Sequence, residues 1–256
     1  MVFDFRTFKQ FFESKTPFCF IRFSDGEMEV IRNRVLSITP GATVFRGRKF
    51  SNHFSTHETK MFSPTEPQHR MLRKDLIAAA TFSGTRFFKG CPGFHNLARE
   101  DHDLLVRLNG KNDERLTHSD LLVNENYTSM QCLLKKIPSI YNKTAIIANH
   151  SARPSAVLGK TEMVSVPDNL FDKYEETLLH VVESISKLKK GSIVLSSASS
   201  LSNIVGHKVW LVRKDITFID VGSAINPFLG LGSQRDYFYP KKWNLMSLFS
   251  ANKMSF

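Results

Sequence analysis

Two carboxylates lie two residues apart on a short turn, where Asp25 and Glu27 flank Gly26. Hard divalent cations such as Mg²⁺ or Mn²⁺ take oxygen ligands from one or two carboxylates, and water and substrate phosphate complete the coordination. A metal at this turn would neutralise charge on a departing phosphate. The alternative is structural, with Asp25 capping the following helix and Glu27 lying at its positive end. Both interpretations stay open, because one carboxylate can cap and coordinate.

A serine cluster at residues 196–200 follows an apolar segment. Its hydroxyls, among them Ser197 and Ser199, and the amides of a helix N-terminus could surround a phosphate. The cluster has neither the Gly-x-Gly-x-x-Gly pattern nor a lysine at P-loop spacing. Helix capping by serine explains it equally well. The chain also lacks a Gly-x-Ser-x-Gly elbow around these serines, which argues against a serine hydrolase.

The elements that must position these residues follow from apolar runs and helical periodicity. Buried strands are predicted at residues 18–23, 144–148, 192–195 and 216–219, and helices at 69–82, 169–190 and 199–213. The last strand, helix and strand form a βαβ unit with parallel strands and a right-handed crossover. The alternation predicts an α/β fold of three layers, with a mostly parallel sheet and helices on both faces. We expect one domain over residues 1–256, with a long irregular segment at residues 37–68.

Polar clusters follow the predicted strands. In open parallel sheets, ligands bind beyond the carboxyl ends of the strands. This rule selects residues 24–27, His150, the serine cluster and residues 220–223. His150 is a candidate acid/base or substrate contact, although an isolated histidine at a strand end is also explained as structural. We therefore expect one ligand site at this edge of the sheet.

A resemblance to a known family adds further expectations about this site. The segment Phe20-Ile21-Arg22-Phe23-Ser24-Asp25-Gly26-Glu27 resembles the Arg-Phe-Gly-Asp-Gly-Glu signature of the GT-D-type glycosyltransferases, a bacterial and viral family with its own α/β fold. Residues 86–92 are similar to the family's second strand, residues 123–127 to its Asn-containing segment, and residues 192–222 to its closing βαβ, which ends in Ile-Asp-Ile-Gly. This sequence departs from the pattern at Ser24, where the family has glycine, and at Ser223, where it commonly has histidine.

The resemblance implies a metal-dependent glycosyltransferase, either a hexosyl- or a pentosyltransferase, with a nucleoside diphosphate sugar as donor. Mn²⁺ or Mg²⁺ would be held by Asp25 and Glu27, and His150 and Asp220 are the candidate acceptor bases. Asp220 is also a candidate contact for a sugar hydroxyl, and Arg235 for a donor phosphate. The expected donor-binding residues are Arg22, Gly26, Ser197, Ser199, Gly222, Ser223 and Arg235.

Charge bears on the acceptor. The 256 residues hold 35 Lys and Arg against 24 Asp and Glu, a net charge of +11, which predicts a phosphate-bearing partner. No acidic residue lies between Glu29 and Glu58. The first choice of acceptor is a glycan, glycoprotein or lipid-linked glycan, for which a basic face would help docking at a membrane. The alternatives are a hydroxymethylated base of viral DNA and, in another class, a non-catalytic basic nucleic-acid-binding protein.

Three cysteines without a Cys-x-x-Cys pair make a disulfide framework or a structural zinc site unexpected. Charges near the amino terminus do not fit a secretory signal, and no apolar run approaches the ~20 residues of a membrane span. We therefore expect a cytoplasmic protein that at most rests on a membrane surface, or that acts within a virus-infected bacterial cell. The sequence indicates no oligomeric state.

Overall fold

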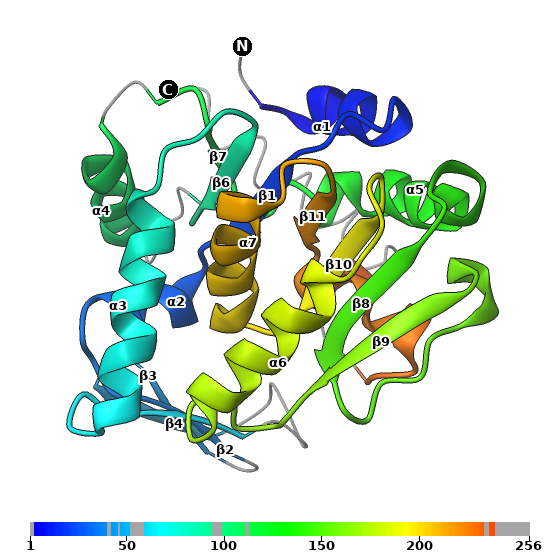
Figure 1. Ribbon diagram of the computed structural model, residues 1–256. Helices are drawn as coiled ribbons and strands as arrows, with labels where there is room; N and C mark the ends of the chain where they lie inside the picture. Colours follow the sequence, from blue (N-terminus) through cyan, green and yellow to red (C-terminus); the bar gives the residue numbers. More distant parts are fainter. Residues whose placement is uncertain are drawn as a thin grey trace.

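A seven-stranded sheet forms the centre of the computed structural model, which describes residues 3–39, 42–45, 47–51, 59–93, 99–110, 113–232 and 236–238. The strand order is β7-β6-β1-β11-β10-β8-β9, and every pairing is parallel. The strands are β1 (Cys19–Arg22), β6 (Phe87–Cys91), β7 (Leu116–His118), β8 (Thr144–Asn149), β9 (Thr161–Val166), β10 (Ile193–Ser197) and β11 (Thr217–Asp220). Figure 1 shows this sheet with helices around it. The predicted α/β fold is confirmed.

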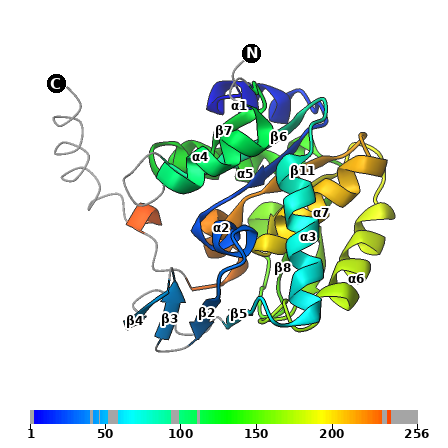
Figure 2. The same ribbon diagram turned by 90° about the vertical axis from the view of Figure 1, so that its left-hand side faces the viewer.

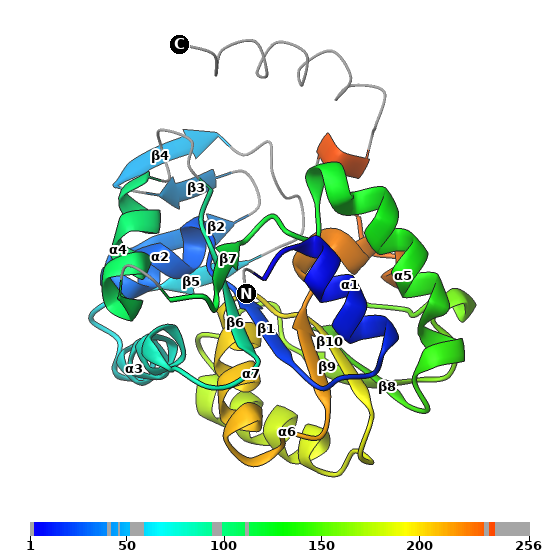
Figure 3. The same cartoon turned by 90° about the horizontal axis from the view of Figure 1, so that it is seen from above.

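Helices cover both faces of the sheet (Figure 3). One face carries α1 (Phe5–Glu13) and α5 (Tyr127–Ile140). The other carries α2 (Asp25–Ile31), α3 (Pro67–Thr81), α4 (Arg99–Asn109), α6 (Tyr174–Ser186) and α7 (Ser200–Val212). None of the helices in the described residues has the length and apolar character of a membrane span.

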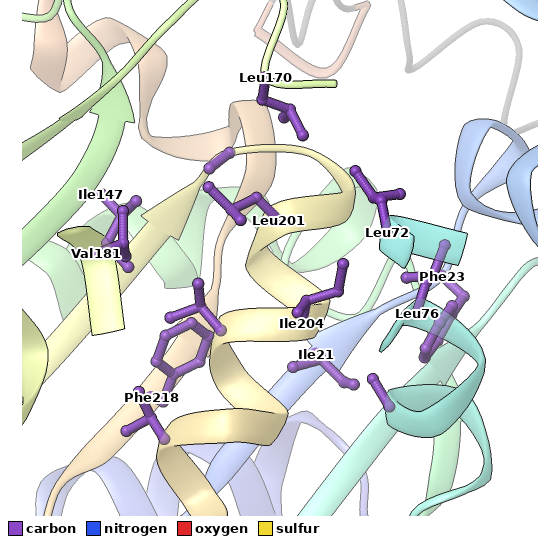
Figure 4. Close-up of a cluster of buried hydrophobic side chains, with 14 of the residues drawn as sticks. Ile21, Phe23, Leu72, Leu76, Ile147, Leu170, Val181, Leu201, Ile204 and Phe218 are labelled. Carbon is purple, nitrogen blue, oxygen red and sulfur yellow. The ribbon is translucent and has the colours of Figure 1, made fainter. Parts of the chain in front are cut away.

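Successive residues of β1 enter opposite cores. Cys19 and Ile21 pack into the core beneath α3, α6 and α7, whereas Phe18 and Phe20 pack into the core beneath α1 and α5. This alternation follows from the two-residue period of a strand, and burial on both faces explains the unbroken apolar run in the sequence. Figure 4 shows part of the first core, with side chains from β1, β11, α3 and α7, including Ile21, Leu72, Leu76, Leu201, Ile204 and Phe218.

A second sheet replaces part of the predicted irregular segment. Its antiparallel strands are β2 (Leu36–Thr39), β3 (Ala42–Phe45), β4 (Arg48–Ser51) and β5 (Lys60–Phe62), in the order β4-β3-β2-β5. Figure 2 shows these strands at one side of the main body. Leu36 and Ile38 alternate with Ser37 and Thr39, the pattern of a half-buried strand. The prediction of an irregular segment is therefore wrong for these residues. The composition of the segment is typical of a loop, whereas the alternation of apolar and polar residues is what favours strands here.

Helix α6 is shorter than predicted and begins at Tyr174 rather than Asn169. The Asn169 side chain donates to Asp172 Oδ2 at 2.7 Å and accepts from the backbone N–H of Met61 at 3.1 Å. These hydrogen bonds fix the segment before α6 and attach it to β5. Strands β7 and β9 were not expected from the sequence, and both lie at an edge of the sheet, where a strand pairs on one side only.

Lys89 is fully buried in β6. Its ammonium donates to the backbone oxygens of Ala80 (3.1 Å) and Phe82 (2.6 Å) at the C-terminal end of α3, and to Asn109 Oδ1. Carbonyls at a helix end have no partner within the helix, so a cation there is well placed. Burial nevertheless lowers the pKa of Lys89 to about 8. The side chain is therefore charged in the folded protein only at a cost.

Replacing Lys89 with methionine should reveal that cost as a dependence of stability on pH. Between the folded pKa of about 8 and the unfolded value near 10.4, the unfolded chain binds more protons at Lys89, so this residue makes stability rise with pH. The free energy of unfolding of the native protein, relative to Lys89→Met, should thus increase by about 2 kcal/mol across this interval. Denaturant unfolding at several pH values measures the difference, in which the buried thiols common to both proteins cancel. A difference that is constant with pH would contradict the assignment.

Candidate functional site

Arg22 and Asp220 end the neighbouring strands β1 and β11 and bind each other. The backbone N–H of Arg22 donates to Asp220 Oδ2 at 3.2 Å, and its Nη2 lies 3.4 Å from Oδ1. The Nη1 atom donates to the backbone oxygen of Ser119 at 3.2 Å. These bonds fix the guanidinium at the carboxyl edge of the sheet, where the polar clusters were expected to meet.

Asp220 is buried and has a perturbed acidity. Burial raises the pKa of its carboxyl, while the Arg22 guanidinium and the N–H of Gly222, at 3.0 Å from Oδ1, act in the opposite direction. The negative charge of Glu27 raises the pKa further. Asp220 is therefore a stronger base than an ordinary aspartate, although it is held by an arginine.

Gly222 makes room for this pair. Its φ is +48°, in the left-handed region that favours glycine, and a Cβ atom there would lie 1.7 Å from Arg22 Nη2. Any other residue would displace the guanidinium. The glycine that follows Asp220 is thus required by the close approach of Arg22 as well as by the turn.

Glu27 joins two helix N-termini. Its side chain is buried, with a relative exposure of 5%. One carboxylate oxygen, Oε2, accepts from the N–H (3.1 Å) and the hydroxyl (2.6 Å) of Ser24, before α2. The other, Oε1, accepts from the hydroxyls of Ser199 (3.3 Å) and Ser200 (3.2 Å), at the start of α7. The carboxylate therefore ties the Asp25 turn to the serine cluster.

Ser199 has a strained backbone. Its φ of +51° and ψ of −142° lie in a region that residues other than glycine rarely adopt. It occupies the turn between β10 and α7, and in this conformation its hydroxyl reaches Glu27. Strain of this kind is typical of binding and catalytic turns, where surrounding contacts maintain it.

Asp25 is the exposed carboxylate of the turn. Its Oδ1 accepts from the N–H of Gly26 at 3.0 Å, and no described residue binds Oδ2. The described part of the chain contains no group of three or more His, Cys, Asp or Glu arranged to hold a metal by themselves. Mg²⁺ requires only one or two carboxylates when phosphate oxygens and water supply the remaining ligands. The residues thus fit a cation that binds together with a diphosphate.

The remaining predicted residues differ in position. Ser197 ends β10 and is half-buried, and Ser223 follows Gly222, with its hydroxyl 2.6 Å from that of Tyr237. His150 follows β8, which β10 separates from β11, and it is 58% exposed, with Nδ1 4.0 Å from Asp168 Oδ1. Within the described residues, it forms no hydrogen bond or ion pair with the other candidates. Arg235 lies outside the described residues.

Several contacts at this edge were not expected from the sequence. Asn203 donates to the backbone oxygen of Arg22 at 2.7 Å, and Ser200 to Glu27. Both lie in the first turn of α7, within one helical turn of Ser199, and this spacing could have identified them. Ser119 and Tyr237 carry no such signal, because only the tertiary fold brings their segments to the site.

The parallel sheet and its two helical layers form an α/β fold, and three solved structures share this fold. One is the selenomethionine-substituted domain of unknown function 1792 (TM-score 0.55, 12% identity), and a second is described as showing that this highly conserved domain has a distinct glycosyltransferase fold (0.54, 12%). A third is a glycosyltransferase of the same domain from Streptococcus sanguinis (0.55, 14%). The alignments cover 96% of this chain and 82%, 82% and 85% of those chains, respectively.

The comparisons extend to the fold and not to the sequence. No family model matches this chain, and no curated protein matches it. At 12–14% identity, the similarity to the solved structures shows the fold alone. The expected fold is supported by these structures, whereas glycosyltransferase activity, the GT-D signature and the role of each site residue stay predictions.

Proposed function

We propose that this protein is a glycosyltransferase that moves a sugar, a hexose or a pentose, from a nucleoside diphosphate sugar to an acceptor hydroxyl. The observation that carries the proposal is the polar cluster formed by Arg22, Glu27 and Asp220 at the carboxyl edge of a glycosyltransferase fold. In open parallel sheets this edge is where nucleotides bind. The strained Ser199 turn beside the cluster supports the same location.

The proposed cofactor is Mn²⁺ or Mg²⁺, held by Asp25 and by the donor diphosphate. When bound, the cation would neutralise charge on the departing diphosphate. Glu27 stays a predicted second ligand, and its Oε1 becomes available only if the hydroxyls of Ser199 and Ser200 turn to other acceptors. In the arrangement described here, Glu27 supports Asp25 by fixing the start of α2 against the start of α7.

The other site residues bind the donor phosphates or orient neighbouring side chains. We assign donor-phosphate contacts to the turn formed by Ser197 and Ser199, where backbone N–H groups of α7 are available, and to Gly222 and Ser223. Arg22 positions Asp220, because two of its guanidinium nitrogens are already engaged. Asp220 is favoured over His150 as the acceptor base, since burial raises its pKa and it lies in the cluster. Arg235 keeps its proposed role as a phosphate clamp.

A glycan or glycoprotein is the proposed acceptor. The acid-free stretch after Glu29 suggested DNA as an alternative, but part of its charge is locally neutralised. Arg32 Nε lies 3.0 Å from Asp101 Oδ1, and Arg34 Nη1 lies 3.6 Å from Glu29 Oε1. These ion pairs leave fewer free cations for a phosphate backbone, so we favour the saccharide over DNA and over a non-catalytic nucleic-acid-binding function.

A thermal-shift screen tests the proposal. One class among UDP-, GDP-, CDP- and TDP-sugars should raise the Tm by about 5 °C or more at saturation, and only when Mn²⁺ or Mg²⁺ is present. Ligand linkage reports the donor without knowledge of the acceptor. If no sugar nucleotide raises the Tm while DNA does so in a salt-sensitive manner, the nucleic-acid-binding alternative would replace the glycosyltransferase.

A further inference from the structure

Helices α1 and α5 lie side by side on the face of the sheet opposite α7 (Figure 3), and a cavity of about 410 Å³ is lined by residues of both. Phe5, Arg6 and Lys9 line it from α1, and the α5 lining is Thr128, Ser129, Cys132, Leu133 and Lys136. Its volume is within the range of small-molecule sites. None of the residues that form the proposed donor site lines it, so it requires a separate explanation.

The cavity lining is cationic. It contains Arg6, Lys9 and Lys136 and no carboxylate. Lys136 donates to Glu13 Oε1 at 2.9 Å. Arg6 and Lys9 are exposed and form no ion pair with any described residue. Two exposed cations that form no direct ion pair therefore lie three residues apart on α1.

The nearby acids cancel only part of this charge, because Asp4 and Glu13 each carry one negative charge close to these cations. Asp4 caps α1 by accepting from the N–H of Thr7 at 2.7 Å, and Glu13 is engaged by Lys136. Exposed Lys135 adds a further positive charge on α5. The surface formed by α1 and α5 thus carries a net positive charge around the cavity.

The inner part of the cavity is apolar. Leu133 is buried and Phe5 is half-buried, while the hydroxyls of Thr128 and Ser129 are exposed. A free phosphate would use only the cations and the hydroxyls. An anion attached to a hydrocarbon chain would use the apolar part as well, so the chemistry of the lining favours an amphiphile.

We propose that this cavity binds the phosphate of an anionic phospholipid headgroup, and that α1 and α5 thereby rest on an anionic membrane surface. Cations close to such a surface each strengthen attachment. This inference goes beyond the proposed transfer reaction and does not depend on it. It supplies a specific surface for the membrane contact that the basic composition only suggested.

Cys132 provides a reporter inside the cavity. It is exposed, whereas Cys19 and Cys91 are buried, so a neutral thiol reagent should label Cys132 first. Phosphatidylglycerol vesicles should slow this labelling by about fivefold or more, and phosphatidylcholine vesicles should leave it unchanged. The Cys132→Ser variant measures any labelling at the other two thiols.

Charge variants distinguish binding at the cavity from a general attraction between the positively charged protein and anionic vesicles. Arg6→Gln combined with Lys9→Gln should weaken binding to phosphatidylglycerol vesicles by roughly 10- to 30-fold in a sedimentation assay. The matched control combines Lys187→Gln with Lys190→Gln, two exposed cations at the end of α6, and should change binding by less than about twofold. Both double variants lose the same charge.

Three results would overturn the proposal. Labelling of Cys132 that anionic vesicles do not slow would exclude this surface. An equal loss of vesicle binding in the control variant would show attraction by net charge only. Protection of Cys132 by inorganic phosphate as strong as that by vesicles would assign the cavity to a soluble phosphate. Sugar transfer plays no part in these assays, so failure of the proposed function would not affect them.

Discussion

Asp25→Asn should lower the rate of sugar transfer by about 10²- to 10³-fold and change the free energy of unfolding by less than about 0.5 kcal/mol. The side chain is exposed, and its Oδ1 accepts a hydrogen bond from the N–H of Gly26, which the side-chain oxygen of asparagine can also do. The variant therefore keeps this hydrogen bond and loses the negative charge, while the N-cap of α2, Ser24, is unchanged. Transfer rates at several Mn²⁺ concentrations, together with denaturant unfolding, measure the two effects.

Glu176→Gln is the matched control for Asp25→Asn. Glu176 is likewise an exposed acid in the first turn of a helix, α6, and it takes part in none of the contacts of the candidate site described above. Its neutralisation should leave transfer and the metal requirement unchanged. If Asp25→Asn retained native activity at every metal concentration, Asp25 would serve only as an acid in the first turn of α2 and the proposed metal position would be wrong.

Glu27→Ala should lower the free energy of unfolding by about 3 kcal/mol and the Tm by roughly 6–12 °C. The substitution removes the acceptor of four hydrogen bonds, from the N–H and hydroxyl of Ser24 and the hydroxyls of Ser199 and Ser200. A carboxylate that is buried and multiply hydrogen-bonded leaves its donors unsatisfied when it is removed. Transfer should fall as well, because the start of α2 is no longer fixed against α7.

Ser200→Ala provides the smaller comparison, because it removes a single donor to Glu27 and should cost about 1 kcal/mol. Denaturant unfolding of both variants gives the values. A Glu27→Ala protein with nearly native stability would show that the carboxylate is not a structural link. Its principal role would then be the metal coordination that the sequence predicts. Glu27→Ala and Asp25→Asn would then both lower transfer without lowering the free energy of unfolding.

Much of the fold follows from the sequence, because a strand buried on both faces must be apolar throughout. The runs that became β1, β8, β10 and β11 have this character. Their parallel arrangement then brings the polar residues after each strand to one edge. This argument correctly brought Glu27, Ser199 and Asp220 to one edge, but it also selected His150, which lies apart from them.

The remaining features of the site depend on tertiary contacts that no local sequence pattern predicts. The Asp-x-Glu spacing suggested two equivalent metal ligands, whereas burial distinguishes an exposed Asp25 from a Glu27 engaged by serines. Likewise, the partner of Arg32 is Asp101 in α4, so the free positive charge of this stretch was overestimated. Both outcomes follow from tertiary packing, which places a partner from another segment beside a side chain.

The position of β1 has a consequence for synthesis of the chain on the ribosome. This early strand pairs with β6 on one side and with β11, the last strand of the main sheet, on the other. Until β11 emerges, β1 has an open apolar edge and Arg22 lacks its carboxylate partner. Chains that stop before Asp220 cannot form the site. We therefore expect the nascent protein to remain prone to aggregation until most of the chain has been made.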